Sequence, residues 1–207
     1  VGLPEVHLGL LPGAGGTQRL PRLIGAKAAL DAILSGAHIP AAKAKATGIV
    51  DEIVDGDLLT AAVAYARKLV ADKAPLKKIR DLKATLESPT LFEDTEKAIS
   101  RKSRGFLAPF HIIKCVKAAV ELPFDEGMKR ERELFQELLF SSQSAAQRFY
   151  FFAEREAAKV KDVPADTPQR DIKTAGIIGC GTMGGGIARS FANAGIPVTI
   201  LETEQAA

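Results

Sequence analysis

The chain has 207 residues and a formal net charge of +3, which is too slight to indicate a nucleic-acid partner. Its hydrophobic fraction of 46% and charged fraction of 26% are ordinary for a soluble globular protein, and no apolar run reaches the ~20 residues needed to span a bilayer. Cys115 and Cys180 are too few and too far apart for a disulfide framework or a zinc site, so we expect no metal.

The N-terminal segment places Glu5 after a proline and follows a short apolar run with a loop of closely spaced glycines. Such a loop can present backbone N–H groups to an oxygen. A lone glutamate after proline is usually a surface residue, so these residues alone assign Glu5 no role. If the segment is extended, His7 shares the side of Glu5, which favours a structural or supporting histidine over a catalytic one.

A predicted helix from Ala26 to Leu34 is bracketed by two glycines. Ile49 to Val54 then reads as a short strand or an extended edge. From Leu58 to Val70 the apolar residues recur at intervals of three and four, which predicts an amphipathic helix with one buried face. These elements are expected to be scaffold.

Residues 81–160 hold little glycine and read as several helices, with candidates at Asp94 to Arg104, Pro109 to Val120, Asp125 to Leu139 and Ala145 to Val160. Within them, the aromatic residues 149–152 are expected to be core. The charge run 129–133 is expected to be a solvated helix face. Residues 161–171 contain prolines and no apolar periodicity, which is typical of a linker.

Near the C-terminus, a G-x-G-x-x-G pattern follows an apolar strand, opens a helix and precedes a second strand that ends in Glu202. Gly179 suits the tight turn, Gly181 lets a pyrophosphate approach the backbone, and Gly184 lets helix and strand pack closely. A carboxylate at Glu202 accepts from ribose hydroxyls and repels a 2′-phosphate, which favours NAD over NADP. A glycine-rich turn in another kind of α/β protein stays the alternative. The expected cofactor-binding residues are Gly179, Gly181, Thr182, Met183, Gly184 and Glu202.

This stretch resembles the NAD-binding start of the 3-hydroxyacyl-CoA dehydrogenases, in which G-x-G-x-M-G-x-G-I-A follows the first strand. Met183-Gly184 and Gly186-Ile187-Ala188 fit that pattern. The resemblance implies hydride transfer that depends on a histidine and a glutamate farther along, for which these 207 residues offer no counterpart.

The segment from Pro4 to Thr17 resembles the signature P-E-x-x-x-G-x-x-P-G-x-G-G-T of the crotonase superfamily of enoyl-CoA hydratases and isomerases. In that family two glutamates hold a water and move protons at the α and β carbons of an acyl-CoA thioester, while two N–H groups stabilise the enolate oxygen. The resemblance implies that Glu5 exchanges the α proton and that the N–H of Gly13 helps to hold the water. It also implies that the first glutamate and both oxyanion donors lie outside this chain.

The two resemblances together imply a multifunctional β-oxidation enzyme, of the peroxisomal type or a bacterial relative. The expected fold is α/β but mostly helical: the C-terminal part of a crotonase-like domain in residues 1–80, a helical linker segment in 81–160, a linker in 161–171, and the first β-α-β of a Rossmann NAD-binding domain in 172–207. The implied location is peroxisomal in a eukaryote and cytoplasmic in a bacterium.

The implied activity is hydration of trans-2-enoyl-CoA to 3-hydroxyacyl-CoA, then NAD-dependent oxidation to 3-ketoacyl-CoA, with double-bond isomerisation in some members. The implied partners are an acyl-CoA thioester and NAD. Two alternatives stay open. The 207 residues alone can be an inactive fragment, or the fusion can act on another acyl-CoA.

Overall fold

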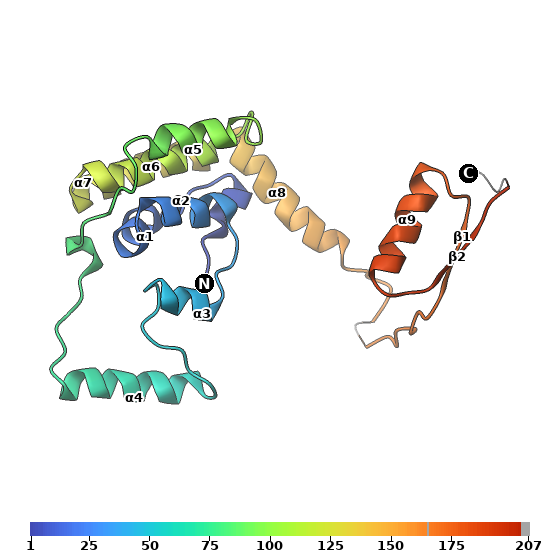
Figure 1. Ribbon diagram of the computed structural model, residues 1–207, viewed down its shortest axis with the longest axis horizontal. Coiled ribbons are helices and arrows are strands. Elements are labelled where there is room, and N and C mark those ends of the chain that lie inside the picture. The colour runs from blue at the N-terminus through green and yellow to red at the C-terminus, as the bar shows by residue number, and fades with distance from the viewer. Residues whose placement is uncertain (165, 204–207) are drawn as a thin grey trace. The chain divides into compact units, whose positions relative to one another are not determined.

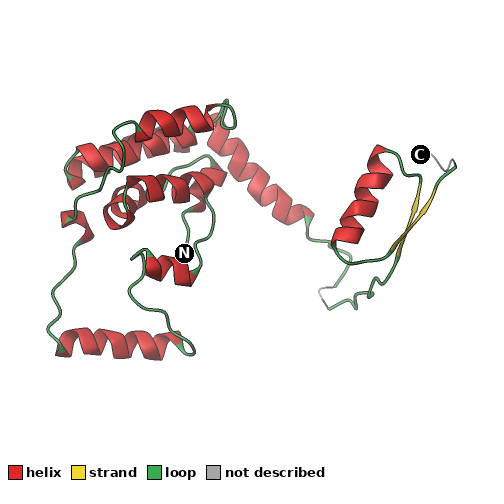
Figure 2. Ribbon diagram, in the orientation of Figure 1, coloured by secondary structure: helices red, strands yellow, loops and turns green. Residues whose placement is uncertain are grey.

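The computed structural model describes residues 1–164 and 166–203, and the chain divides into two compact units, Val1–Ala158 and Lys159–Ala207 (Figure 1). Helices dominate, with one two-stranded parallel sheet in the second unit (Figure 2). This arrangement confirms the predicted mostly helical α/β fold. None of the helices in the described ranges is both long and apolar enough to cross a membrane.

The first unit is built from helices. In chain order they are η1 (Pro4–Leu8), α1 (Gly16–Ile24), α2 (Ala26–Ser35), α3 (Ala41–Ala46), α4 (Leu58–Ala71), η2 (Ile79–Asp81), α5 (Leu91–Ser100), α6 (Ala108–Glu121), α7 (Phe124–Leu139) and α8 (Ser142–Ala157). The helices predicted over residues 94–160 are present, and most of their ends differ from the predicted ones by a few residues, although α7 ends at Leu139 as predicted. Helix ends depend on capping groups, which the apolar period does not locate.

The core of this unit lies where α1, α2, α6 and α7 pack together. Its fully buried side chains include Leu11, Leu30, Ile33, Ile112, Leu134 and Leu138. Helices from the predicted 1–80 and 81–160 segments thus share one core. The division at residue 80 stays a prediction about domain boundaries.

Helix α4 forms where the apolar spacing predicts it, and the Asp57 side chain caps it by accepting from the N–H of Thr60 at 2.8 Å. The prediction of a buried face is wrong for the described residues, because Leu59 is 75% exposed and Val70 is 78% exposed. Periodicity predicts which face is apolar but not whether a neighbour covers it. Of the two alternatives for residues 49–54, a short strand or an extended edge, the strand is wrong. The N–H groups of Ile49 and Val50 bond back to Ala44 O at the end of α3.

The prediction that the aromatic residues 149–152 are core is wrong as well. Phe149, Tyr150 and Phe152 on α8 are between 66% and 76% exposed. The Phe151 ring lies edge-on to that of Phe152 at 5.3 Å and under the Arg155 guanidinium at 3.3 Å. Four consecutive helical residues point in all directions around a helix, so they cannot all face one core.

The second unit contains β1 (Ala175–Ile178), α9 (Thr182–Asn193) and β2 (Val198–Leu201). The strands pair in parallel, with Ala175 opposite Val198 and Ile178 opposite Leu201. This confirms the predicted β-α-β unit. It forms from local sequence because each strand-to-helix connection is short.

Candidate functional site

Glu5 lies on η1, which is a 3-10 helix and not the extended segment considered above. Pro4 begins this turn, and Gly9 ends it in the left-handed conformation with φ of 66°. The Leu10 N–H donates to Glu5 O at 3.1 Å. The Glu5 side chain is half-buried, and its Oε2 is buried with no hydrogen-bond partner in the described part of the chain. An unpaired buried carboxylate oxygen is costly, so it indicates a site that needs an explanation.

His7 does not share the side of Glu5, because a 3-10 helix has about three residues per turn and residues two apart point in different directions. The side chain of His7 is exposed and lies over Gly36, where an added Cβ would be 2.5 Å from the imidazole Nε2. Its position fits a structural histidine.

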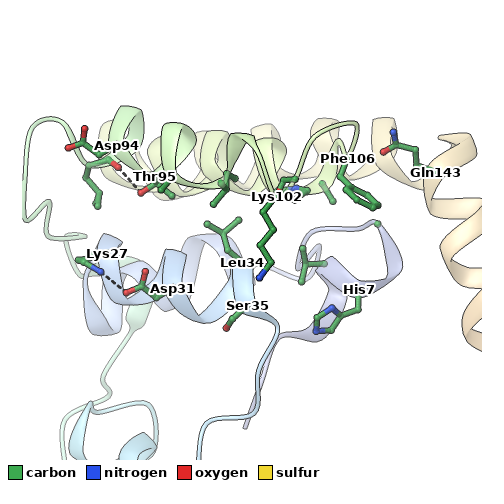
Figure 3. Close-up of a pocket in the computed structure, with 18 of the residues that line it drawn as sticks. His7, Lys27, Asp31, Leu34, Ser35, Asp94, Thr95, Lys102, Phe106 and Gln143 are labelled. Atoms are coloured by element: carbon green, nitrogen blue, oxygen red, sulfur yellow. Dashed lines mark hydrogen bonds and ion pairs between the residues drawn. The ribbon is translucent and has the colours of Figure 1, made fainter. Parts of the chain in front are cut away.

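His7 also lines a pocket of about 980 Å³ that lies between α2 and α5. Figure 3 shows Leu34 and Lys102 directed into this space from the two sides, with His7 at its edge. Glu5 and Gly13 do not line it. The pocket therefore does not join the two predicted catalytic residues.

Gly13 lies in the exposed part of the glycine loop, against the ring of Phe135 on α7. An added Cβ at Gly13 would be 2.4 Å from Phe135 Cδ2, so the backbone approaches the ring more closely than any side chain would allow. Gly15, with φ of 86°, is the N-cap residue of α1 and supplies no side-chain cap.

The missing cap comes from Glu131 on α7. Its Oε1 accepts from the Gly15 N–H at 2.7 Å, and its Oε2 accepts from the Thr17 N–H at 3.2 Å and from the Thr17 hydroxyl. The prediction that residues 129–133 form a solvated face is wrong for Glu131, which is 1% exposed. Burial raises the pKa of Glu131, and the bonds from Thr17 and Gly15 oppose that rise.

One sequence signal could have indicated this burial. Glu131 lies three and seven residues before Leu134 and Leu138, so all three share the apolar stripe of α7. The neighbouring residues of opposite charge make it hard to see that Glu131 shares the helix face of the two leucines.

The loop network continues into the core through Gln18. Its Nε2 donates to the Thr17 hydroxyl at 3.1 Å and to the Cys115 carbonyl at 2.9 Å. Burial raises the pKa of the Cys115 thiol to about 12, which keeps the thiol protonated and inert.

In the second unit, the three glycines of the predicted nucleotide loop have different surroundings. Gly179 has φ of 87°, which favours glycine. An added Cβ at Gly184 would lie 1.8 Å from the Gly179 carbonyl oxygen, whereas one at Gly181 would meet no atom within 4 Å. Gly179 and Gly184 are thus required by the turn itself. The open space at Gly181 is available to a ligand.

Helix α9 begins at Thr182 with Gly181 as its N-cap, and its first N–H groups have no partner within the helix. Met183 in this turn is 75% exposed. Such a helix start favours a phosphate group. Within the described part of the chain, no cluster of three or more potential metal ligands occurs.

Glu202 follows β2 and points back to the glycine loop. Its Oε2 accepts from the Cys180 N–H, and its Oε1 accepts from the Thr203 N–H at 2.8 Å. The bond from Cys180, followed by that from Thr203, lowers the pKa of Glu202 below its usual value. A carboxylate that stays ionised beside the loop can accept from a ribose diol.

Comparison with known proteins gives two family matches. The family described as "Enoyl-CoA hydratase/isomerase" matches residues 1–114, and "3-hydroxyacyl-CoA dehydrogenase, NAD binding domain" matches residues 174–207.

Among curated relatives, proteins named "Peroxisomal bifunctional enzyme" from Cavia porcellus and Homo sapiens are 41% identical, and that from Danio rerio is 42% identical. Each match covers 99% of this chain and 29% of the relative. The chain therefore spans less than a third of the length of these relatives.

Proposed function

Because the chain belongs to the enoyl-CoA hydratase/isomerase family, we propose that its protein hydrates trans-2-enoyl-CoA to 3-hydroxyacyl-CoA and then oxidises that product with NAD to 3-ketoacyl-CoA. The observation that carries this proposal is the order of the two family matches along one chain. The hydration step is tested by adding trans-2-enoyl-CoA to the full-length protein and measuring the loss of absorbance of the conjugated thioester. If the protein hydrates no enoyl-CoA but still forms an oxidation product with NAD, its substrate is another acyl-CoA.

In the proposed hydration, water adds its hydroxyl to the β carbon and a proton arrives at the α carbon. We assign the transfer of this α proton to Glu5, whose buried Oε2 has no partner in the described residues. We assign to the Gly13 N–H a share in holding the water. Glu5 then acts on the substrate directly, and Gly13 acts through its backbone.

We propose that the β1-α9-β2 unit binds NAD through Gly179, Gly181, Thr182, Met183, Gly184 and Glu202. The pyrophosphate would lie over Gly181 at the start of α9, where the backbone is open. Glu202 would accept from the ribose hydroxyls of the adenosine half. The bound cofactor supplies the hydride acceptor, and the chain's own residues orient it.

A Glu202→Ala variant of the full-length protein is expected to bind NADH more weakly and to discriminate less against NADPH. The carboxylate accepts from a ribose diol but repels a 2′-phosphate. Its removal should therefore lower the affinity for NADH and raise the affinity for NADPH. Titration of both cofactors measures this. Asp171→Ala, an exposed acid of the same unit, serves as the matched control. Equal affinity of the unaltered protein for NADPH and NADH would contradict the assignment.

For residues 1–207 alone we infer no hydratase activity. The resemblance requires a second glutamate and two oxyanion donors, and the loss of one such donor typically costs about 10²–10³ in rate. Enoyl-CoA hydration by the purified 207-residue chain above a buffer blank would refute this inference. The names of the relatives support a peroxisomal location in a eukaryote, which imaging of the full-length protein would test.

A further inference from the structure

Helix α7 presents one face to the glycine loop that precedes α1. Gly127, Glu131 and Phe135 follow one another at intervals of four residues, so they share that face. Phe135 lies against Gly13, while an added Cβ at Gly127 would be 2.1 Å from Gln18 Oε1. The loop and the first turn of α1 are therefore packed along a single side of α7.

Glu131 is the polar centre of this face. The first N–H groups of a helix have no partner within the helix, and the N-cap Gly15 has no side chain to supply one. The Glu131 carboxylate accepts from the N–H groups of Gly15 and Thr17 across a separation of more than 100 residues. Because it is buried, these bonds have little competition from water.

Glu5 is held by different contacts. Its helix η1 packs against α2 and α8, and the Ser144 hydroxyl on α8 donates to Leu8 O at 3.0 Å. No hydrogen bond found in the described residues joins Glu131 to η1. A change at Glu131 should thus move the loop that carries Gly13 and leave the Glu5 carboxylate in place.

We propose that Glu131 is a positioning residue for hydration, which fixes the glycine loop so that the Gly13 N–H stays aimed at the attacking water. This inference rests on the proposed hydratase function. The proposal predicts different effects on two reactions that can be measured with the same protein. Addition of water needs both Gly13 and Glu5, whereas removal of an α proton from a saturated acyl-CoA needs Glu5 without a positioned water.

The test uses Glu131→Gln in the full-length protein. Glutamine keeps the size of the side chain but turns one acceptor into a donor, which must then face the N–H of Gly15 or of Thr17. We expect kcat for hydration to fall about tenfold or more, since small misplacements of catalytic groups have effects of this size, with little change in KM. Exchange of the α proton of a saturated acyl-CoA in D2O should fall far less.

The matched control is Glu133→Gln on the same helix. Glu133 is 62% exposed and pairs with Arg130 at 2.9 Å, so its replacement should change neither rate. A merely structural role of Glu131 would lower hydration and α-proton exchange together. Equal loss of the two rates, or no loss of hydration, would overturn the proposal.

If Glu131→Gln does not yield folded protein, Thr17→Val decides. It keeps the side-chain shape and removes the hydroxyl, which donates to Glu131 and accepts from Gln18. The ratio of hydration to α-proton exchange should fall again, and an unchanged ratio in this variant would overturn the proposal. Failure of the proposed function looks different, because the unaltered protein would then hydrate no enoyl-CoA at all.

Discussion

A Glu5→Gln variant of the full-length protein is expected to hydrate trans-2-enoyl-CoA more slowly by about 10² or more, the usual scale for a general acid–base residue. Glutamine has nearly the same shape, so it fits the half-buried position on η1. It cannot deliver or accept the α proton. The atom whose chemistry is lost is the buried Oε2 of Glu5, which has no hydrogen-bond partner among the residues that the structure describes.

Two controls isolate the effect of the Glu5 substitution. Oxidation of 3-hydroxyacyl-CoA by the same variant should be unchanged, because Glu5 and the β1-α9-β2 unit belong to separate compact units. Glu52→Gln alters an exposed glutamate of the same unit and should leave hydration intact. Hydration by Glu5→Gln at the rate of the unaltered protein would contradict the catalytic assignment.

Substitutions at Gly181 and Gly184 are expected to abolish NADH binding for opposite reasons. A Cβ added at Gly181 would meet no atom within 4 Å, so we expect Gly181→Val to fold normally and to block only the approach of the pyrophosphate. A Cβ at Gly184 would overlap the Gly179 carbonyl, so Gly184→Ala should disrupt the turn itself. Overpacking typically costs about 1–3 kcal/mol, and a clash with backbone lies at the upper end.

Thermal unfolding and NADH titration of both variants separate the two causes. Gly181→Val should leave the unfolding temperature of the second unit unchanged and abolish NADH binding. Gly184→Ala should lower the unfolding temperature and also abolish NADH binding. Thr199→Ala, on the exposed side of β2, is the matched control in the same unit. Unimpaired NADH binding by Gly181→Val would contradict the place assigned to the pyrophosphate.

The β-α-β unit could be predicted because its signals are local. The glycine spacing, the helix after it and the acid after the second strand all lie within 28 residues, from Ala175 to Glu202. The surroundings of Gly184 follow directly from that turn. The hydrogen bond from the Cys180 N–H to Glu202 was not predictable from spacing alone, because it depends on how the side chain folds back after β2.

The N-terminal site shows what sequence reasoning omits. Glu5 and Gly13 are indicated by a motif, but the carboxylate that organises the glycine loop of Gly13 comes from Glu131 on another helix. A charged residue inside a charge run is expected to be solvated. Only its spacing of three and seven residues from Leu134 and Leu138 indicates that Glu131 lies on their buried face. Burial was predicted wrongly in the other direction for α4 and for Phe149, since apolar residues need a covering neighbour that periodicity does not identify.

The most direct test of the account supplies the full-length protein with trans-2-enoyl-CoA and NAD and follows the appearance of NADH. We predict that the unaltered protein forms NADH from both the enoyl-CoA and the 3-hydroxyacyl-CoA. The Glu5→Gln variant should form it at the normal rate from the 3-hydroxyacyl-CoA alone. Failure of the unaltered protein to form NADH from enoyl-CoA, while it is folded and binds NADH, would contradict the proposed sequence of hydration and oxidation.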